Sequence, residues 1–262
     1  MAHPIRLVTF DVLYTLIVPR LPIHVQYSRT FEPYLGVLDP VSIRRSFRVA
    51  YRSLEVEQPV YANGSQAWWS EVIRRTALGA GADQKALDAS LPKIVPRLLH
   101  RFSSKEGYRA FEDAIPTVHY LQHELNIQTA VVSNADARIH WFTGLALQDL
   151  GFPASLDPIV LSQEAGIEKP SPEIFLQTLS MVNSRLSERP IIPEECLHVG
   201  DEVDCDYDGA LAAGMKAFLL RRASSDGEPT AHKGPQRPLD GVQVVEDLDA
   251  VTRWLKVYNG SL

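Results

Sequence analysis

The sequence predicts an α/β protein, with a Rossmann-like parallel sheet as the core domain and an all-α domain inserted into it. Short, nearly continuous apolar runs of strand length alternate with helix-length segments through much of the chain. Such runs are typical of strands that are buried on both faces of a parallel sheet. The alternation is interrupted between residues 18 and 107, where only helical periodicity is seen.

The strand-length runs begin near the N-terminus and recur through the second half of the chain. They are IRLVTF at 5–10, IQTAVVS at 127–133, PIVLS at 158–162, CLHVG at 196–200, KAFLL at 216–220 and a last run, VQVVED, at 242–247. A short amphipathic helix through Val251, Trp254 and Leu255 is expected to close the chain. Residues 223–241 are rich in Gly, Pro and polar residues, which predicts an exposed loop.

The segment 18–107 is expected to form a separate helical domain. Its apolar residues recur at three- and four-residue spacing, as one face of an amphipathic helix requires. The first such face comprises Ile43, Phe47, Ala50, Tyr51 and Leu54, and a second begins with Trp69, Val72 and Ile73. We therefore predict a core domain at 1–17 and 108–262 and a helical domain at 18–107.

Composition narrows the classes of partner. The 262 residues carry a formal charge of −6, which gives no basic surface for a nucleic acid backbone, and no run of 18 apolar residues predicts a membrane span. Cys196 and Cys205, the only cysteines, favour neither a disulfide framework nor a zinc site. The N-terminus lacks the pattern of a signal peptide, so we expect a cytoplasmic protein, with the nucleus as the alternative, and the oligomeric state stays open.

Polar residues follow several of the apolar runs directly. Asp11 follows the first run, Ser133 ends the second and Asn134 comes directly after it, and Asp201 follows the fourth. Lys169 precedes a Pro-Ser-Pro step that predicts the start of a helix. Because the carboxyl ends of parallel strands meet at the edge of the sheet where ligands bind, we expect these residues to converge on one site.

Each residue type suits the chemistry of phosphate esters. An aspartate such as Asp11 can attack phosphorus and form an aspartyl-phosphate that water then cleaves. Ser133 and Asn134 can donate hydrogen bonds to phosphoryl oxygens, and Lys169 can neutralise charge on the nucleophile and on the transferring group. The acidic run GDEVDCDYDGA at 200–210 and Asp11 offer oxygen ligands for Mg²⁺.

The order of these residues resembles the four motifs of the haloacid dehalogenase (HAD) superfamily. The motifs are Asp11-x-x-x-Thr15, Ser133-Asn134, Lys169-Pro170, and Gly200-Asp201 with Asp206. The resemblance spans residues 5 to about 222, and the helical insertion is similar to the superfamily's C1 cap. The stretches HVGDEVDCDYDGALAAGM, SNADAR and QAWWSEV look most like the branch called haloacid dehalogenase-like hydrolase domain-containing protein 3.

The resemblance implies a role for each motif residue. Asp11 would be the nucleophile, Lys169 would steady the charges, and Thr15 and Ser133 would bind phosphate. The implied cofactor is Mg²⁺. Its ligands would be Asp11, the backbone carbonyl of Leu13, Asp201 and Asp206, the last either directly or through bound water.

The chain departs from the family at Leu13, where the phosphatases carry a second aspartate that protonates the leaving group and activates water. Such acid–base help contributes about 10²–10⁴-fold to the rate. The adjacent Tyr14 does not replace it, because a phenol with a pKa near 10 is a poor base at neutral pH.

The leading expectation is therefore a weak Mg²⁺-dependent phosphatase of small phosphorylated molecules. A catalytically impaired relative with a binding or interaction role is the first alternative, favoured by Leu13. The second is a 2-haloacid dehalogenase, which uses the same aspartate without a metal and which the acidic run of the last motif disfavours.

Overall fold

The computed structural model describes residues 3–61, 64–135, 147–222 and 238–261. The chain divides into two compact units. The core unit consists of Met1–Val18, Ala110–Ala135 and Leu150–Leu262, and the helical unit of Pro19–Arg109 and Asp136–Asp149.

The core unit is built on a parallel sheet. Within the described parts of the chain, six strands form this sheet in the order β5-β4-β1-β6-β7-β8, and every pairing between neighbours is parallel. The strands are β1 (Leu7–Phe10), β4 (Gln128–Ser133), β5 (Ile159–Leu161), β6 (Cys196–Gly200), β7 (Lys216–Leu220) and β8 (Val244–Val245). The predicted α/β, Rossmann-like fold class is confirmed.

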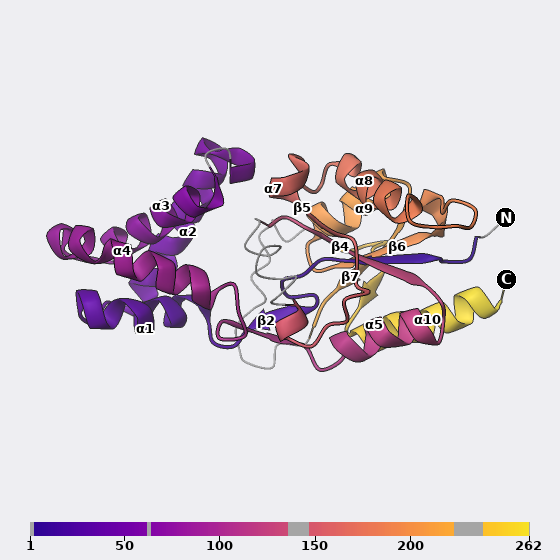
Figure 1. Ribbon diagram of the computed structural model, residues 1–262, viewed down its shortest axis with the longest axis horizontal. Helices are drawn as coiled ribbons and strands as arrows, with labels where there is room; N and C mark the ends of the chain where they lie inside the picture. The colour runs from indigo at the N-terminus through magenta and orange to yellow at the C-terminus, as the bar shows by residue number, and fades with distance from the viewer. Residues whose placement is uncertain (1–2, 62–63, 136–146, 223–237, 262) are drawn as a thin grey trace. The chain divides into compact units, whose positions relative to one another are not determined.

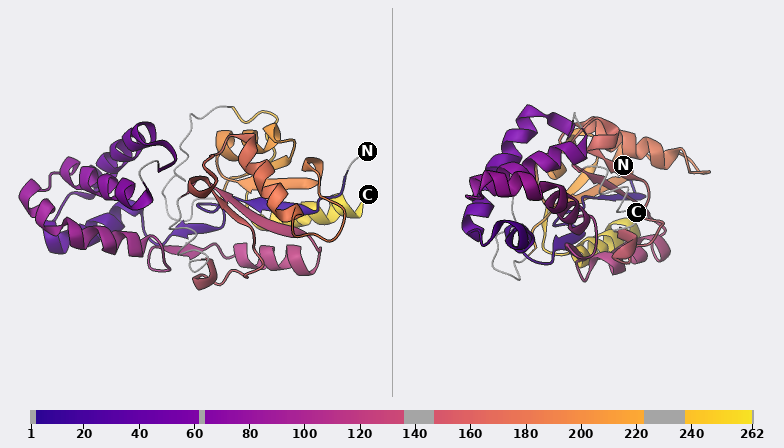
Figure 2. Two further views of the ribbon diagram at one scale, coloured as in Figure 1. Left: turned by 45° about the horizontal axis from the view of Figure 1, so that its top comes forward. Right: turned by 60° about the vertical axis from the view of Figure 1, so that its left-hand side comes forward.

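Helices cover both faces of this sheet, as Figures 1 and 2 show. On one face lie α5 (Ala114–His123) and α10 (Leu248–Gly260), and on the other lie α8 (Pro172–Asn183) and the short α9 (Gly209–Ala212). The central strands β1 and β6 are buried along their whole length, which explains their unbroken apolar runs. The described part of this unit also contains a short helix, α7 (Ser162–Ala165), a 3₁₀ turn, η2 (Pro193–Glu195), and a π-helical segment, η3 (Val203–Asp208).

Side chains from alternate strand positions form the core beneath α8. Leu7, Ala130 and Val132 from the sheet pack in one buried cluster with Ile174 and Phe175 from that helix. Because successive strand residues point to opposite faces, the intervening residues pack on the other side of the sheet. The strands are thereby packed on both faces.

The predicted C-terminal helix is confirmed as α10. The Asp247 side chain caps its first turn by accepting a hydrogen bond from the N–H of Ala250 at 2.6 Å. Val251 and Leu255 are fully buried, as the amphipathic pattern requires. Of the predicted loop at 223–241, residues 223–237 lie outside the described residues.

The helical unit contains α1 (Ile23–Leu35), α2 (Pro40–Glu57), the 3₁₀ turn η1 (Pro59–Tyr61), α3 (Ser65–Gly79) and α4 (Gln84–Arg101). The predicted apolar faces are its core: Ile43, Ala50 and Leu54 of α2 are buried, and so are Val72 and Ile73 of α3. Among the described residues, no helix of either unit is both long and apolar enough to cross a membrane.

A two-stranded sheet forms where the chain passes between the two units. Strand β2 (Ile17–Pro19) follows the turn after β1, and it pairs with β3 (Tyr108–Ala110), which leads back toward α5. The backbone N–H of Phe111, just beyond β3, donates to the carbonyl of Leu16 at 3.0 Å. The turn between β1 and β2 is therefore fixed at both ends by strand pairing.

Candidate active site

The sheet order places the motif residues side by side. Strand β1 lies between β4 and β6, so the residues that follow these strands meet at one edge. Asp11 follows β1, and its N–H donates to the carbonyl of Val199 at 3.0 Å, which continues the pairing with β6. Ser133 ends β4 and Asp201 follows β6. The Ser133 hydroxyl donates to Asp11 Oδ1 at 3.0 Å, so two neighbouring strand ends are joined directly.

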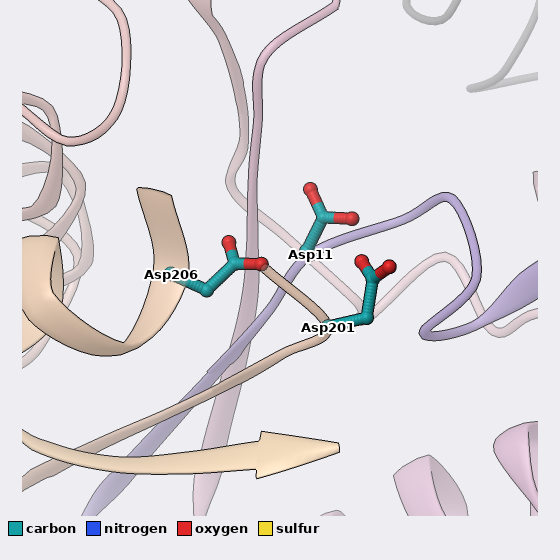
Figure 3. Close-up of side chains that lie close together, drawn as sticks. All are labelled: Asp11, Asp201 and Asp206. Atoms are coloured by element: carbon teal, nitrogen blue, oxygen red, sulfur yellow. The ribbon is translucent and has the colours of Figure 1, made fainter. Parts of the chain in front are cut away.

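Buried carboxylates meet at this edge, as Figure 3 shows. One oxygen each from Asp11, Asp201 and Asp206 lie within 4.8 Å of one another. Their residues are 8%, 4% and 1% exposed, so water screens their charges poorly. Asp206 comes from η3, and its Oδ2 accepts a hydrogen bond from the N–H of Glu202 at 2.8 Å.

Lys169 supplies positive charge to two of these carboxylates. Its Nζ lies 2.7 Å from Asp11 Oδ1 and 2.5 Å from Asp206 Oδ1, and it also donates to the carbonyl of Val132 at 3.0 Å. Burial alone would lower the pKa of Lys169, but the charges of Asp11 and Asp206 raise it well above its ordinary value. Burial likewise opposes ionisation of Asp206, yet Lys169 and then His198 hold its pKa below the usual range. Lys169 and Asp206 are therefore both charged at neutral pH.

Asp201 has the opposite electrostatic environment. Burial raises the pKa of Asp201 well above its ordinary value, and the negative charges of Asp11 and Asp206 raise it further. Such a cluster gains stability from a cation that sits among its oxygens. Carboxylate oxygens are the ligands that hard divalent cations such as Mg²⁺ prefer, so the residues present fit the metal implied by the resemblance.

Asn134 uses its side chain to hold the lysine loop. Its Nδ2 donates to the carbonyl of Lys169 at 2.8 Å, and its Oδ1 accepts from the N–H of the same residue at 2.7 Å. This pair of hydrogen bonds aligns the backbone from which the Lys169 side chain reaches Asp11. The phosphate contact predicted for Asn134 therefore stays a prediction, and the contacts of its amide are those of a positioning group.

The turn from Asp11 to Thr15 has an unusual backbone. Tyr14 has a φ of 63°, in the left-handed region that non-glycine residues seldom adopt, and its N–H donates to the carbonyl of Ile17 at 2.7 Å. Leu13 is half-buried and forms an isolated bridge with Ile17. Its aliphatic side chain can neither donate nor accept a proton at this position.

Thr15 ends this turn inside the protein. It is fully buried, and its Oγ1 has no hydrogen-bond partner among the residues that the structure describes. Its carbonyl accepts from Arg222 Nη2 at 2.9 Å, while both terminal nitrogens of Arg222 also bind the Asp113 carboxylate, each at 2.9 Å. Arg222, just after β7, is held by Asp113, just before α5, and thereby fixes the backbone of Thr15. This contact was not predicted from the sequence.

One more residue at the site, His198, escaped the sequence analysis. His198, in the middle of β6, is fully buried, and its Nε2 lies 3.2 Å from Asp206 Oδ1. The signal was a lone polar residue within the apolar run CLHVG. Gly200 lies against the same carboxylate: a Cβ added there would lie 2.2 Å from Asp206 Cγ, so only glycine lets Asp206 approach.

The fold and site define a hydrolase class, and comparison with known proteins agrees. A model of the haloacid dehalogenase-like hydrolases matches residues 5–214, so the chain belongs to that family. Within the family it is similar to haloacid dehalogenase-like hydrolase domain-containing protein 3 of Danio rerio, which is 32% identical over 235 residues, 88% of this chain and 90% of the relative. The predicted superfamily and branch are both confirmed.

Solved structures share the fold across nearly the whole chain. A HAD phosphatase from Thermococcus onnurineus superposes with a TM-score of 0.59 at 19% identity, covering 96% of this chain and 98% of its own. A 2-haloacid dehalogenase from Pseudomonas syringae pv. Tomato DC3000 superposes with a TM-score of 0.57 at 22% identity, covering 95% and 99%. At these identities the likeness establishes the fold alone, since both reactions occur on it.

Proposed function

We propose that this protein is a weak Mg²⁺-dependent phosphatase of small phosphorylated molecules that acts through an aspartyl-phosphate on Asp11. The observation that carries the proposal is the placement of Lys169 between Asp11 and Asp206, beside the buried Asp201. Within this proposal, residues 1–17 and 108–262 form the catalytic domain and 18–107 form a C1 cap.

Asp11 is the group that reacts. Its Oδ1 accepts hydrogen bonds from Ser133 and Lys169, so we infer that Oδ2 attacks phosphorus. The new Oδ2–P bond forms as the bond from phosphorus to the leaving oxygen breaks, and the leaving group takes a proton from water. A water molecule then attacks the aspartyl-phosphate, releases inorganic phosphate and restores the Asp11 carboxylate.

The surrounding residues hold and neutralise the phosphoryl group. The hydroxyl of Thr15, which lacks a partner among the described residues, is assigned to a phosphoryl oxygen. The hydroxyl of Ser133 is assigned to another phosphoryl oxygen, toward which its single proton turns from Asp11 Oδ1. Lys169 balances the charge of Asp11 before attack and that of the phosphoryl group afterwards. Asp11, the Leu13 carbonyl, Asp201 and Asp206 would hold Mg²⁺, which when bound supplies positive charge to the transferring group.

Leu13 sets the limits of this activity. With no carboxylate at this position, the leaving group must depart without a proton from the protein, and water must attack without a general base. Activity should therefore be low on alkyl phosphates and higher on substrates with good leaving groups. The aspartyl-phosphate should also be cleared slowly.

The proposal is tested by hydrolysis of p-nitrophenyl phosphate and acetyl phosphate with Mg²⁺ and with EDTA. Turnover by the wild type should require Mg²⁺, disappear in Asp11→Asn and increase in Leu13→Asp. Asp204→Asn, which removes an exposed carboxylate from the same acidic run, is the matched control and should retain wild-type turnover. No turnover by the wild type and by a folded Leu13→Asp would refute the phosphatase proposal.

Leu13 also favours a second candidate, a protein that keeps metal and phosphate binding for an interaction role. Its signature would be calorimetric binding of Mg²⁺ and inorganic phosphate by a wild type that turns over neither substrate. The remaining alternative, 2-haloacid dehalogenation, predicts chloride release from 2-chloropropionate in EDTA. As to location, the free thiols Cys196 and Cys205 support our proposal of a reducing, cytoplasmic setting.

A further inference from the structure

A buried histidine connects the central strands to the lysine–aspartate pair. His198 lies opposite Thr9 in the register between β6 and β1, and its Nδ1 is 2.8 Å from Thr9 Oγ1. Its Nε2 is 3.2 Å from Asp206 Oδ1, the same oxygen that accepts from Lys169 Nζ. Both Thr9 and His198 are fully buried. The contacts form a continuous chain from Thr9 through His198 and Asp206 to Lys169 and Asp11.

The acceptor at one end determines the direction of each hydrogen bond in this chain. An ionised carboxylate only accepts, so the proton must lie on Nε2 for His198 to bond Asp206. Nδ1 of a neutral imidazole is then an acceptor, and it takes the hydroxyl proton of Thr9. The Phe175 ring packs edge-on against the imidazole at 5.0 Å between centroids, which fixes the ring plane.

The histidine also completes the support of the Asp206 carboxylate. Oδ2 is fixed by the N–H of Glu202, and Oδ1 is held by both Lys169 and His198. Without His198, Lys169 would be the only group that holds Oδ1. The carboxylate could then turn while Oδ2 stays bonded to the N–H of Glu202. Lys169 would then lose its fixed counter-charge and its position against Asp11.

We propose that Thr9 and His198 are positioning residues that orient Asp206 and thereby hold Lys169 on the nucleophile. The proposal rests on the proposed function and extends it to residues outside the family motifs. An apolar side chain would fill this strand position without the free-energy cost of burying an imidazole. A histidine is explained here because each of its ring nitrogens has a hydrogen-bond partner. Partners of this kind, which orient the groups of a site, typically contribute about 10–100-fold to metal affinity or activity.

The tautomer can be measured without substrate or metal. Side-chain ¹⁵N NMR of the wild type, with the His198 signals assigned by their loss in His198→Gln, should show a protonated Nε2 and an unprotonated Nδ1 at pH 7.5. Thr9→Val should perturb the Nδ1 resonance, whereas Thr9→Ser should leave it near its wild-type position. A proton on Nδ1 in the wild type would overturn the proposed chain of hydrogen bonds.

Matched variants separate positioning from simple packing. The amide nitrogen of His198→Gln occupies the place of Nε2 and should retain most of the function, whereas that of His198→Asn occupies the place of Nδ1 and does not reach Asp206. We expect kcat to fall about 10–100-fold in His198→Asn with little change in KM, and calorimetric Mg²⁺ affinity to fall by a similar factor. Equal losses in the Gln and Asn variants would refute the positioning role.

Thr178→Val is the control for loss of a buried hydroxyl. Thr178 is fully buried in α8, and its Oγ1 donates to the Ile174 carbonyl of the same helix at 2.8 Å. Its replacement should leave kcat and Mg²⁺ affinity unchanged. If the wild type hydrolyses neither substrate, the proposed function fails, while the tautomer and the Gln–Asn difference in Mg²⁺ affinity still decide the proposal for His198.

Discussion

Replacing Lys169 by methionine should destabilise the core unit strongly. The side chain is 3% exposed and its ammonium group bonds Asp11, Asp206 and the Val132 carbonyl. Methionine has a similar length but no charge, so the variant leaves like charges buried within 4.8 Å of one another. The change therefore tests whether the lysine is the structural counter-ion of the site.

The size of the loss follows from the burial of these groups. Removing one partner of a buried ion pair costs about 3–5 kcal/mol, because the orphaned charge stays buried. For a domain of this size, each kcal/mol lowers Tm by about 2–4 °C, so the expected shift is about 6–20 °C. An additional Asp206→Asn substitution should recover part of this loss, since it removes one of the unpaired charges.

Differential scanning calorimetry of the metal-free protein at pH 7.5 measures this shift. Lys256→Met is the matched control: Lys256 is exposed on α10, over the ring of Tyr120 at 4.6 Å, and its replacement should cost less than about 1 kcal/mol. A Tm of Lys169→Met within about 2 °C of the wild type, or no recovery in the double variant, would refute the ion-pair reasoning.

Three further predictions concern other parts of the core unit. Burial raises the pKa of Cys196 to about 12 and that of Cys205 well above its usual value. At pH 8 both thiols should therefore react far more slowly with an aromatic disulfide reagent in the native protein than in urea. Equal rates in the two states would contradict this. Gly200→Ala should lower the urea-unfolding free energy by about 1–3 kcal/mol through overlap with the Asp206 carboxylate. Gly260→Ala, with no neighbouring atom within 4 Å, should not lower it, and equal losses would refute the overlap. Tyr14→Gly should stabilise the fold by about 1 kcal/mol, because the relief of left-handed backbone strain outweighs the added entropy of the unfolded chain. A loss of stability in the same measurement would show that the tyrosine ring contributes more to stability than the strain costs.

The fold was predictable because the central strands of its sheet are buried on both faces. An unbroken apolar run such as LVTF in β1 reports that burial directly, and the polar residue after it marks the carboxyl edge of the sheet. Asp11, Ser133 and Asp201 could therefore be brought to one edge from sequence alone, before the strand order was known.

The contacts within the site were less predictable because they depend on where each side chain points in the folded protein. The sequence identifies Asn134 as a hydrogen-bonding residue, but it does not reveal that both polar atoms of its amide bind the backbone of Lys169. His198 pairs with Thr9 through strand register, over 189 positions of sequence separation, and no motif spacing reports such a pair. The hydrogen bond from Arg222 to the Thr15 carbonyl was unpredictable for the same reason, since it joins residues separated by 207 positions.

Trapping the covalent intermediate shows whether Asp11 is the nucleophile of the reaction. The wild type, Leu13→Asp and Asp11→Asn would be incubated with acetyl phosphate and Mg²⁺, quenched in acid and analysed by intact-mass and peptide mass spectrometry. One added phosphoryl group is expected on Asp11 in the wild type, with faster clearance of it in Leu13→Asp and no adduct in Asp11→Asn. A folded wild type that binds Mg²⁺ yet acquires no phosphoryl group on Asp11 would contradict this expectation.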